Sequence, residues 1–428
     1  MWMVAIAFFG LMLLGMPIGV VLGVSGAIGL LQLGDPSFLA MAPKRYFEGL
    51  DMFTFMAMPF FILAGELMNA SGITQRLIAF AMSLVGYLRG GLAHANMVAS
   101  VLFAGMTGAA VSDAAAMGNT LVPAMVKQGY SKPFACAVTA AGSIIGPTIP
   151  PSNLMVIYGS LMGVSIAGLF AAGIVPGLLI CAICMAVIGA LGKKLGLPKG
   201  EGRPSLGNIL ASFKDSLIGL TMPAIILGGI LAGIVTPTEA ASIAVAYALF
   251  VGFAVYRTLT LNQVVVMLIR TARITGAVFL IIAAASILSW WLTFHQIPQM
   301  IAQAMLSITD SKAGVIGMIL ALLLIVGMFL DITAALIILA PVLGPLTLAV
   351  GIEPVHAGIM IILALNLSLM TPPVGACLFV LCSVTGEKLE RIARALTPFL
   401  IAEVAILILI AYWSDLTLFV PRLFGYVN

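Results

Sequence analysis

Two pairs of adjacent prolines, Pro150-Pro151 and Pro372-Pro373, interrupt segments that are otherwise almost wholly apolar. Each proline lacks a backbone N–H and clashes with the preceding helical turn, so a helix cannot run through either pair without freeing carbonyl oxygens. Inside a bilayer, a carbonyl oxygen without a partner costs several kcal/mol. Carbonyl oxygens joined by a hydroxyl, here Thr107 or Thr371, suit a small, hard cation such as Na⁺. We therefore interpret both proline pairs as cation-binding breaks in membrane helices.

The two proline pairs belong to a longer pattern that occurs twice in the chain. In the first copy, Asp113 precedes Pro123 by ten residues, and in the second copy Asp331 precedes Pro341 by ten residues. Each acid comes before the double proline of its own copy. A helix that is merely kinked for packing remains the alternative interpretation of a single proline pair. The repetition in register favours a binding function.

The composition is that of a membrane protein. The chain has 428 residues, of which 62% are hydrophobic and 8% are charged, and its mean hydropathy is +1.22. A soluble domain has about 25% charged residues. Apolar runs long enough to cross a bilayer recur along the chain, at residues 165–192, 216–235, 238–256, 274–294 and 397–413. We predict an all-α, polytopic membrane protein.

Other kinds of chemistry have little support in the sequence. The three histidines are scattered and the five cysteines lie in apolar segments, so we see no metal set and expect no organic cofactor. Cys181 and Cys184 have the spacing of a redox motif, but they fall inside an expected span and are interpreted as small buried residues. The net charge of +4 comes without a basic stripe, which argues against nucleic-acid binding.

A polar linker divides the chain into two halves, residues 1–192 and residues 215–428. The linker, residues 193–214, contains five Lys or Arg, so the positive-inside rule places it in the cytoplasm. Counting spans outward from the linker gives the two halves opposite orientations, with Lys44 and Arg45 outside as a mild violation. Inverted repeats with interrupted helices are typical of secondary transporters.

Each half is expected to contain a re-entrant helical hairpin followed by a broken helix. The hairpins are predicted at about 95–126 and 313–350, because Gly, Thr, Ser and Asp interrupt the middle of these apolar segments. The broken helices are predicted at about 134–160 and 355–384. The hairpin tips and the breaks would meet near the bilayer midplane. There, the N-terminal ends of half-helices attract an anion and freed carbonyls bind a cation.

Two further acids lie within or near expected spans, where an ionisable group is a functional hypothesis by default. Glu239 follows two threonines, and we predict that Thr236 or Thr238 caps a helix whose first turn contains this acid. Glu66 lies near the end of a span and is assigned to the membrane interface.

The repeated acids Asp113 and Asp331 raise alternative functions. We expect them to orient the hairpin tips, with a direct part in transport as a second possibility. An intramembrane aspartyl protease is the alternative from the enzyme class, but that chemistry needs paired carboxylates that share a proton. An ion channel would need a pore ring, usually with oligomeric symmetry. Internal inverted symmetry instead favours alternating access, so we expect a transporter and not an enzyme.

Four segments in order resemble the large membrane subunit of TRAP transporters, the tripartite ATP-independent periplasmic family. They are residues 228–252, 105–125, 146–159 and 371–380, and the resemblance extends along nearly the whole chain. It implies an elevator-type, Na⁺-driven importer of organic anions, such as C4-dicarboxylates, sialic acids or keto acids, in a bacterial or archaeal inner membrane. It also implies two partners: a small four-helix membrane subunit, expected as a separate chain, and a periplasmic substrate-binding protein.

The resemblance also implies binding residues. One Na⁺ site would be formed by Thr107, Gly146, Ile149 and Pro151. The other would be formed by Gly327, Ser368, Thr371 and Pro373. For the organic anion, we expect contacts with Thr107, Ser152, Asn153 and Thr371. The chain departs from the family at two places: Thr-Gly-Ala-Ala at 107–110 replaces a serine-rich tip, and Ser368 stands where glycine is frequent.

Overall fold

The computed structural model describes residues 2–200, 205–309 and 311–427, except for the side chains of Pro36 and Thr107. Within these residues every regular element is a helix, which confirms the all-α prediction. Seven of the described segments are long and apolar enough to cross a membrane: Phe53–Ala70, Ile166–Lys194, Leu206–Leu231, Pro237–Val255, Leu261–Phe294, Ile332–Ala349 and Leu389–Tyr412. The chain is therefore a multi-pass membrane protein.

The first half of the chain supplies helices α1 to α10, which run from the N-terminus to the polar linker. They are α1 (Trp2–Leu13), α2 (Ile18–Leu31), α3 (Pro36–Glu48), α4 (Ala57–Ala70), α5 (Ile73–Val85), α6 (Gly91–Thr107), α7 (Ala110–Lys127), α8 (Lys132–Ser143), α9 (Asn153–Met162) and α10 (Ile166–Lys194). A short 3₁₀ helix, η1 (Phe53–Met56), precedes α4.

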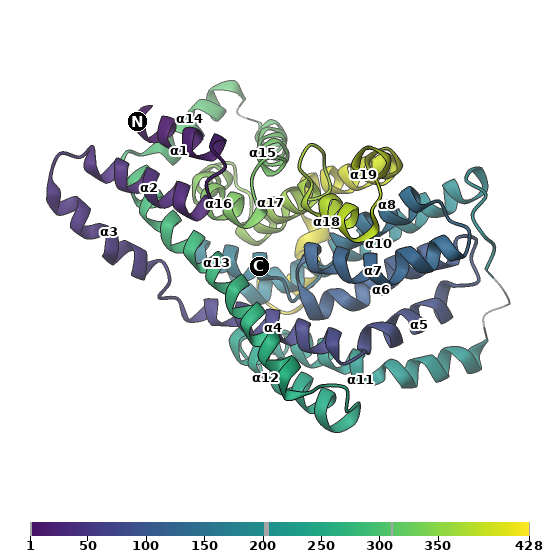
Figure 1. Ribbon diagram of the computed structural model, residues 1–428. Helices are drawn as coiled ribbons and strands as arrows, with labels where there is room; N and C mark the ends of the chain where they lie inside the picture. Colours follow the sequence, from purple (N-terminus) through teal and green to yellow (C-terminus); the bar gives the residue numbers. More distant parts are fainter. Residues whose placement is uncertain (1, 201–204, 310, 428) are drawn as a thin grey trace.

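The second half supplies helices α11 to α20. They are α11 (Leu206–Leu231), α12 (Pro237–Phe250), α13 (Leu261–Phe294), α14 (Ile297–Ile308), α15 (Lys312–Gly327), α16 (Ile332–Ala349), α17 (Pro354–Ser368), α18 (Ala376–Thr385), α19 (Leu389–Tyr412) and α20 (Asp415–Leu423). Figure 1 shows α13 running diagonally across one side of the molecule, and it packs against α2, α3 and α4.

Local sequence explains where the long helix α13 begins. The Thr260 hydroxyl accepts a hydrogen bond from the Gln263 backbone N–H, and the Gln263 side chain accepts one from the Thr260 backbone N–H. This capping box satisfies backbone donors that the first turn of a helix leaves without partners. It places the helix start well before the apolar run that the sequence indicated.

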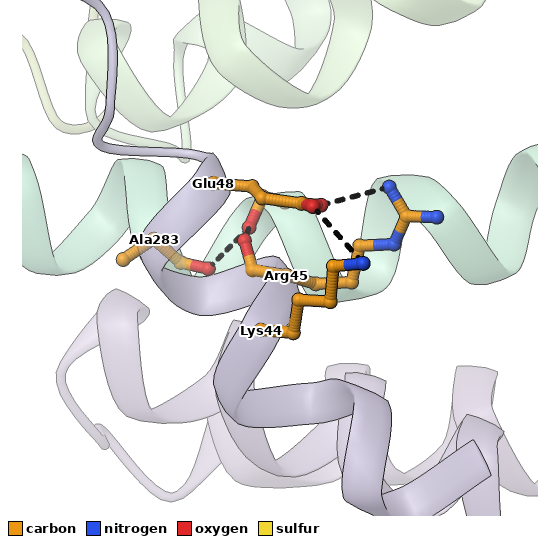
Figure 2. A network of polar contacts seen from close by, with 5 residues as sticks. Lys44, Arg45, Glu48 and Ala283 are labelled. Atoms are coloured by element: carbon orange, nitrogen blue, oxygen red, sulfur yellow. Dashed lines mark hydrogen bonds and ion pairs between the residues drawn. The ribbon is translucent and has the colours of Figure 1, made fainter.

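Helix α3 is fastened to α13 by polar groups. The Ser286 hydroxyl lies 2.7 Å from the carbonyl oxygens of Arg45 and Ala283, so it can donate to either. Figure 2 shows Lys44 and Arg45 both turned toward Glu48, at N–O distances of 3.7 and 3.1 Å. The two cations that depart from the positive-inside pattern are thus ion-paired on the same helix.

Two expectations about element boundaries meet different outcomes. The linker is shorter than the sequence suggested, because residues 206–214 belong to α11. Ile209, Leu210 and Phe213 continue the helical spacing of the apolar run that follows, which the charged residues nearby obscured. The prediction for Glu239 is confirmed: Thr236 caps α12, and the Glu239 side chain returns a hydrogen bond of 2.8 Å to the Thr236 backbone N–H.

Candidate functional site

The tip of the first hairpin rests on the first double proline. Helix α6 ends at Thr107 and α7 begins at Ala110, so only two residues make the turn. Gly108 there has a φ of +61°, which favours glycine. A Cβ added to Gly108 would lie 2.5 Å from the carbonyl oxygen of Pro151, so the two backbones touch.

The first helix break lies between α8 and α9 and is closed off from solvent. All residues from 144 to 152 are buried, and the Pro150-Pro151 peptide bond is cis. Within the described part of the chain, the carbonyl oxygens of Gly146, Ile149 and Pro151 accept no hydrogen bond. Three oxygens that could serve a cation therefore lie in one buried loop.

Asp113 lies beside this loop. Its side chain is 1% exposed, and an added Cβ at Gly146 would run into its Oδ2 atom. The acid therefore places a carboxyl group next to the first break, in the first turn of α7. The two broken helices also meet here, because the Asn366 amide of α17 donates to the Thr148 hydroxyl at 3.3 Å.

The second hairpin has a longer tip than the first. Helix α15 ends at Gly327, and α16 begins only at Ile332. An added Cβ at Gly327 would meet the side chain of Ser368, at the end of α17, so this tip also rests on its own helix break. Asp331 caps α16, because its side chain accepts hydrogen bonds from the backbone N–H groups of Thr333 and Ala334 at 2.9 and 3.2 Å.

The second helix break, residues 369–375, is more open than the first. Pro373 is exposed, and Pro372-Pro373 is again a cis peptide bond. The Thr371 hydroxyl donates to the Leu367 carbonyl at 2.9 Å, which leaves its oxygen lone pairs available. The carbonyl oxygens of Gly327, Thr371 and Pro373 accept no hydrogen bond from the residues that the structure covers, whereas that of Ser368 accepts one from Thr371 N–H.

A cavity of about 210 Å³ lies where both tips and both breaks come together. Four helices present their N-terminal ends to it: α7 through Ala110, α9 through Asn153, α16 through Ile332 and α18 through Ala376. Helices α4 and α13 close the remaining side. Asp331 already accepts the first N–H groups of α16, whereas α7, α9 and α18 have no side-chain cap among the described residues. Uncapped helix N-termini carry partial positive charge and free N–H donors, so the cavity suits an anion.

The residues expected to bind substrate have different positions relative to this cavity. Asn153 lines it, and its Oδ1 atom is buried without a hydrogen-bond partner in the described chain. Ser152 is fully buried and Thr371 is partly buried, and neither is among the lining residues. The side chain of Thr107 lies outside the described residues.

Glu66 is a further residue of this cavity that the sequence did not indicate. Glu66 on α4 lines the cavity wall and forms an ion pair of 3.0 Å with Arg270 on α13, a role that its position near the end of an apolar segment did not indicate. The only signal in the sequence was one acid and one base in two separate, largely apolar segments. Their pairing depends on how α4 and α13 pack, which the sequence does not reveal.

The repeated acids have different local roles in the two halves. Asp113 is buried inside the first turn of α7, whereas Asp331 is exposed and caps α16. The reason is that α16 starts four residues later than α7 relative to the shared proline, because residues 328–331 remain outside the helix. The equal spacing between acid and proline therefore does not give Asp113 and Asp331 the same environment.

Known proteins are similar to this chain in sequence and in fold. The family model described as "Tripartite ATP-independent periplasmic transporter, DctM component" matches residues 5–416. The chain is 40% identical to the sialic acid TRAP transporter large permease protein SiaM of Vibrio cholerae, over 98% of each chain. It is 39% identical to the C4-dicarboxylate TRAP transporter large permease protein DctM of Pseudomonas aeruginosa, over 94% of each chain. Both relatives are permeases, which fits the expectation of a transporter and not an enzyme.

A solved structure resembles the chain in fold. It is the crystal structure of the YdaH transporter of Alcanivorax borkumensis, with a TM-score of 0.59 and 15% sequence identity, covering 93% of this chain and 97% of that one. At this identity the likeness concerns the fold alone. The family match and the two permease relatives extend over nearly the entire sequence. The chain therefore belongs to the DctM component family of tripartite ATP-independent periplasmic transporters.

Proposed function

We propose that this chain is the Na⁺-coupled membrane subunit that imports a small organic anion. The observation that carries the proposal is the cavity on which four helix N-termini converge, with a break that frees backbone oxygens on either side. The N-termini would bind the carboxylate or sulfonate of the substrate. Freed carbonyl oxygens would bind the coupling cations, as half-helices do in other secondary transporters.

The two Na⁺ ions would bind at the two breaks. The first would contact the carbonyls of Gly146, Ile149 and Pro151, close to the carboxyl of Asp113 and to Thr107. The second would contact Gly327, Ser368, Thr371 and Pro373. Support comes from the buried or unpaired carbonyl oxygens of both loops and from the contact of each hairpin tip with its own break. Binding the ions would hold the tips against the breaks and complete the anion site between them.

Substrate would cross the membrane by motion of a block against a scaffold. The block contains both hairpins and both broken helices, and the scaffold includes α4 and α13, which form the far wall of the cavity. All four elements must move together, since each completes only part of the site. Inverted repeats would supply the two access states.

The remaining components follow from the family. A periplasmic binding protein would deliver the anion, and a small membrane subunit would pack on the scaffold, in the inner membrane of the cell. The names of two relatives include sialic acid and C4-dicarboxylate, so these two classes are the first substrates to test.

The test is uptake into proteoliposomes that contain this chain, its small subunit and its binding protein. Radiolabelled N-acetylneuraminate and succinate serve as the probes, at one fixed pH. An inward Na⁺ gradient should drive accumulation of one of them, and replacing Na⁺ with K⁺ should abolish it. Undiminished uptake in K⁺ would contradict Na⁺ coupling, and uptake without the binding protein would contradict the three-component assembly.

A further inference from the structure

We propose that Arg270 is the release site for the anionic group of the substrate, and that Glu66 is the counter-ion that the substrate displaces there. The inference rests on the proposed import of an organic anion and adds a residue for its exit. Arg270 and Glu66 form an ion pair of 3.0 Å between α13 and α4. Both helices belong to the wall of the central cavity.

The geometry provides a path from the cavity to this pair. A second hollow of about 400 Å³ is lined by Arg270, Gln263 and Thr260, and it shares Glu66 and Asn69 with the central cavity. Arg270 lies about one helical turn from Ile274, which lines the central cavity from the same helix. Glu66 and Asn69 therefore form the partition between the two spaces.

The charges along this path favour movement of an anion from the central cavity toward Arg270. The side chains that line the central cavity include two acids, Glu66 and Asp331, but no Lys or Arg among the described residues. The only positive charge that the described lining offers an anion there is the partial charge of helix N-termini. Arg270 is the first full positive charge on the route through the shared partition, and α13 begins near Arg257 on the side that the positive-inside rule makes cytoplasmic.

The ion pair is suited to exchange. The side chain of Arg270 is 61% exposed and that of Glu66 is 23% exposed, so the protein does not enclose the pair. Exposed pairs of this kind contribute little free energy, which lets another carboxylate compete. A guanidinium binds a carboxylate or sulfonate through two parallel N–H donors. As the substrate leaves, Glu66 returns to Arg270 and expels it into solvent.

The experiment measures the half-saturation concentration from the cytoplasmic face. Oriented proteoliposomes are loaded with increasing concentrations of the probe that the wild type transports, N-acetylneuraminate or succinate, and counterflow of external label is recorded. Arg270→Gln should raise the internal half-saturation concentration roughly tenfold. Glu66→Gln should lower it, about threefold, because Arg270 then binds the anion without a competitor. Arg270→Lys should fall between the wild type and Arg270→Gln.

Two controls make the result decisive. Arg273→Gln removes an exposed charge from the same helix but not from either hollow, and it should leave the internal constant unchanged. The external constant should stay within about twofold of the wild type in every variant, since Arg270 acts at release. Opposite shifts of the internal half-saturation concentration in Arg270→Gln and Glu66→Gln support the proposal. Equal losses in both would show that the pair only fastens α4 to α13, and an unchanged Arg270→Gln would also overturn it. Failure of the wild type to move any probe would instead contradict the proposed function.

Discussion

The two hairpin-and-break units have the same order of elements but differ in how firmly they are enclosed. The first break is buried along its whole length, and the turn that covers it has only two residues. The second break exposes Pro373 and is covered by a longer turn. The first break is thus enclosed by the protein, whereas the second is exposed at Pro373.

The contacts at the two tips explain this difference. Gly108 touches a carbonyl oxygen of the first break, and a backbone atom cannot rotate away. Gly327 touches the side chain of Ser368, which has other rotamers available. A common sequence pattern has therefore produced one tip that lies against backbone and one that lies against a side chain, and the two should respond differently to the same substitution.

The largest effect is expected for Gly108→Ala. The new Cβ would lie against the Pro151 carbonyl, in a backbone conformation that alanine adopts at a cost of about 1 kcal/mol or more. The tip would have to lift from the break, so Na⁺-dependent uptake should fall to background. Gly163→Ala is the matched control, because Gly163 has a similar φ of +66° and nothing within 4 Å of its added Cβ. Equal uptake by the two variants would contradict the enclosed first half-site.

A smaller effect should separate the two acids. Asp113→Asn replaces a buried carboxyl group beside the first break with a neutral amide, so the apparent Na⁺ affinity of uptake should fall roughly tenfold. Asp331→Asn keeps a side chain that caps α16 equally well, so it should leave that affinity near the wild-type value. Uptake measured against Na⁺ concentration gives both constants. Identical shifts would show that the two acids act alike after all.

The smallest effect is expected for Gly327→Ala, which should lower the rate of uptake about threefold as Ser368 moves aside. Ser368→Gly in the same chain removes the obstacle and should restore the rate. A double-mutant cycle on initial rates isolates this coupling. If the double variant is no faster than Gly327→Ala alone, the second tip does not depend on Ser368.

The helix breaks and the capping of α12 follow from local sequence, whereas the ion pair between α4 and α13 does not. The capping of α12 by Thr236 depends on four consecutive residues, and the double prolines mark both helix breaks by backbone chemistry alone. The pair of Glu66 and Arg270 joins residues 204 positions apart. Its formation depends on the rotation of the 34-residue helix α13 against α4, and no periodic pattern fixes that rotation.

The environment of Asp331 was missed for a related reason. The spacing between acid and proline is preserved in both halves, but the point at which the helix starts is not. A four-residue difference in where the helix starts relative to the proline changes a buried acid into an exposed helix cap, and the type of residue alone does not reveal which of the two applies.

The central claim is that both units move as one block past α4 and its preceding turn, and cysteine crosslinking tests it most directly. Thr54 of η1 and Ser160 of α9 have hydroxyl oxygens 2.6 Å apart, so Thr54→Cys with Ser160→Cys should crosslink in the state described here. Val156 lies about one turn earlier on α9, roughly 6 Å along the helix axis, and it does not line the central cavity. In a background without the five native cysteines, Thr54→Cys with Val156→Cys should also crosslink, in the second state. We expect each crosslink to stop uptake and its reduction to restore uptake. A crosslink at Ser160 alone, with uptake continuing while it is intact, would contradict a moving block.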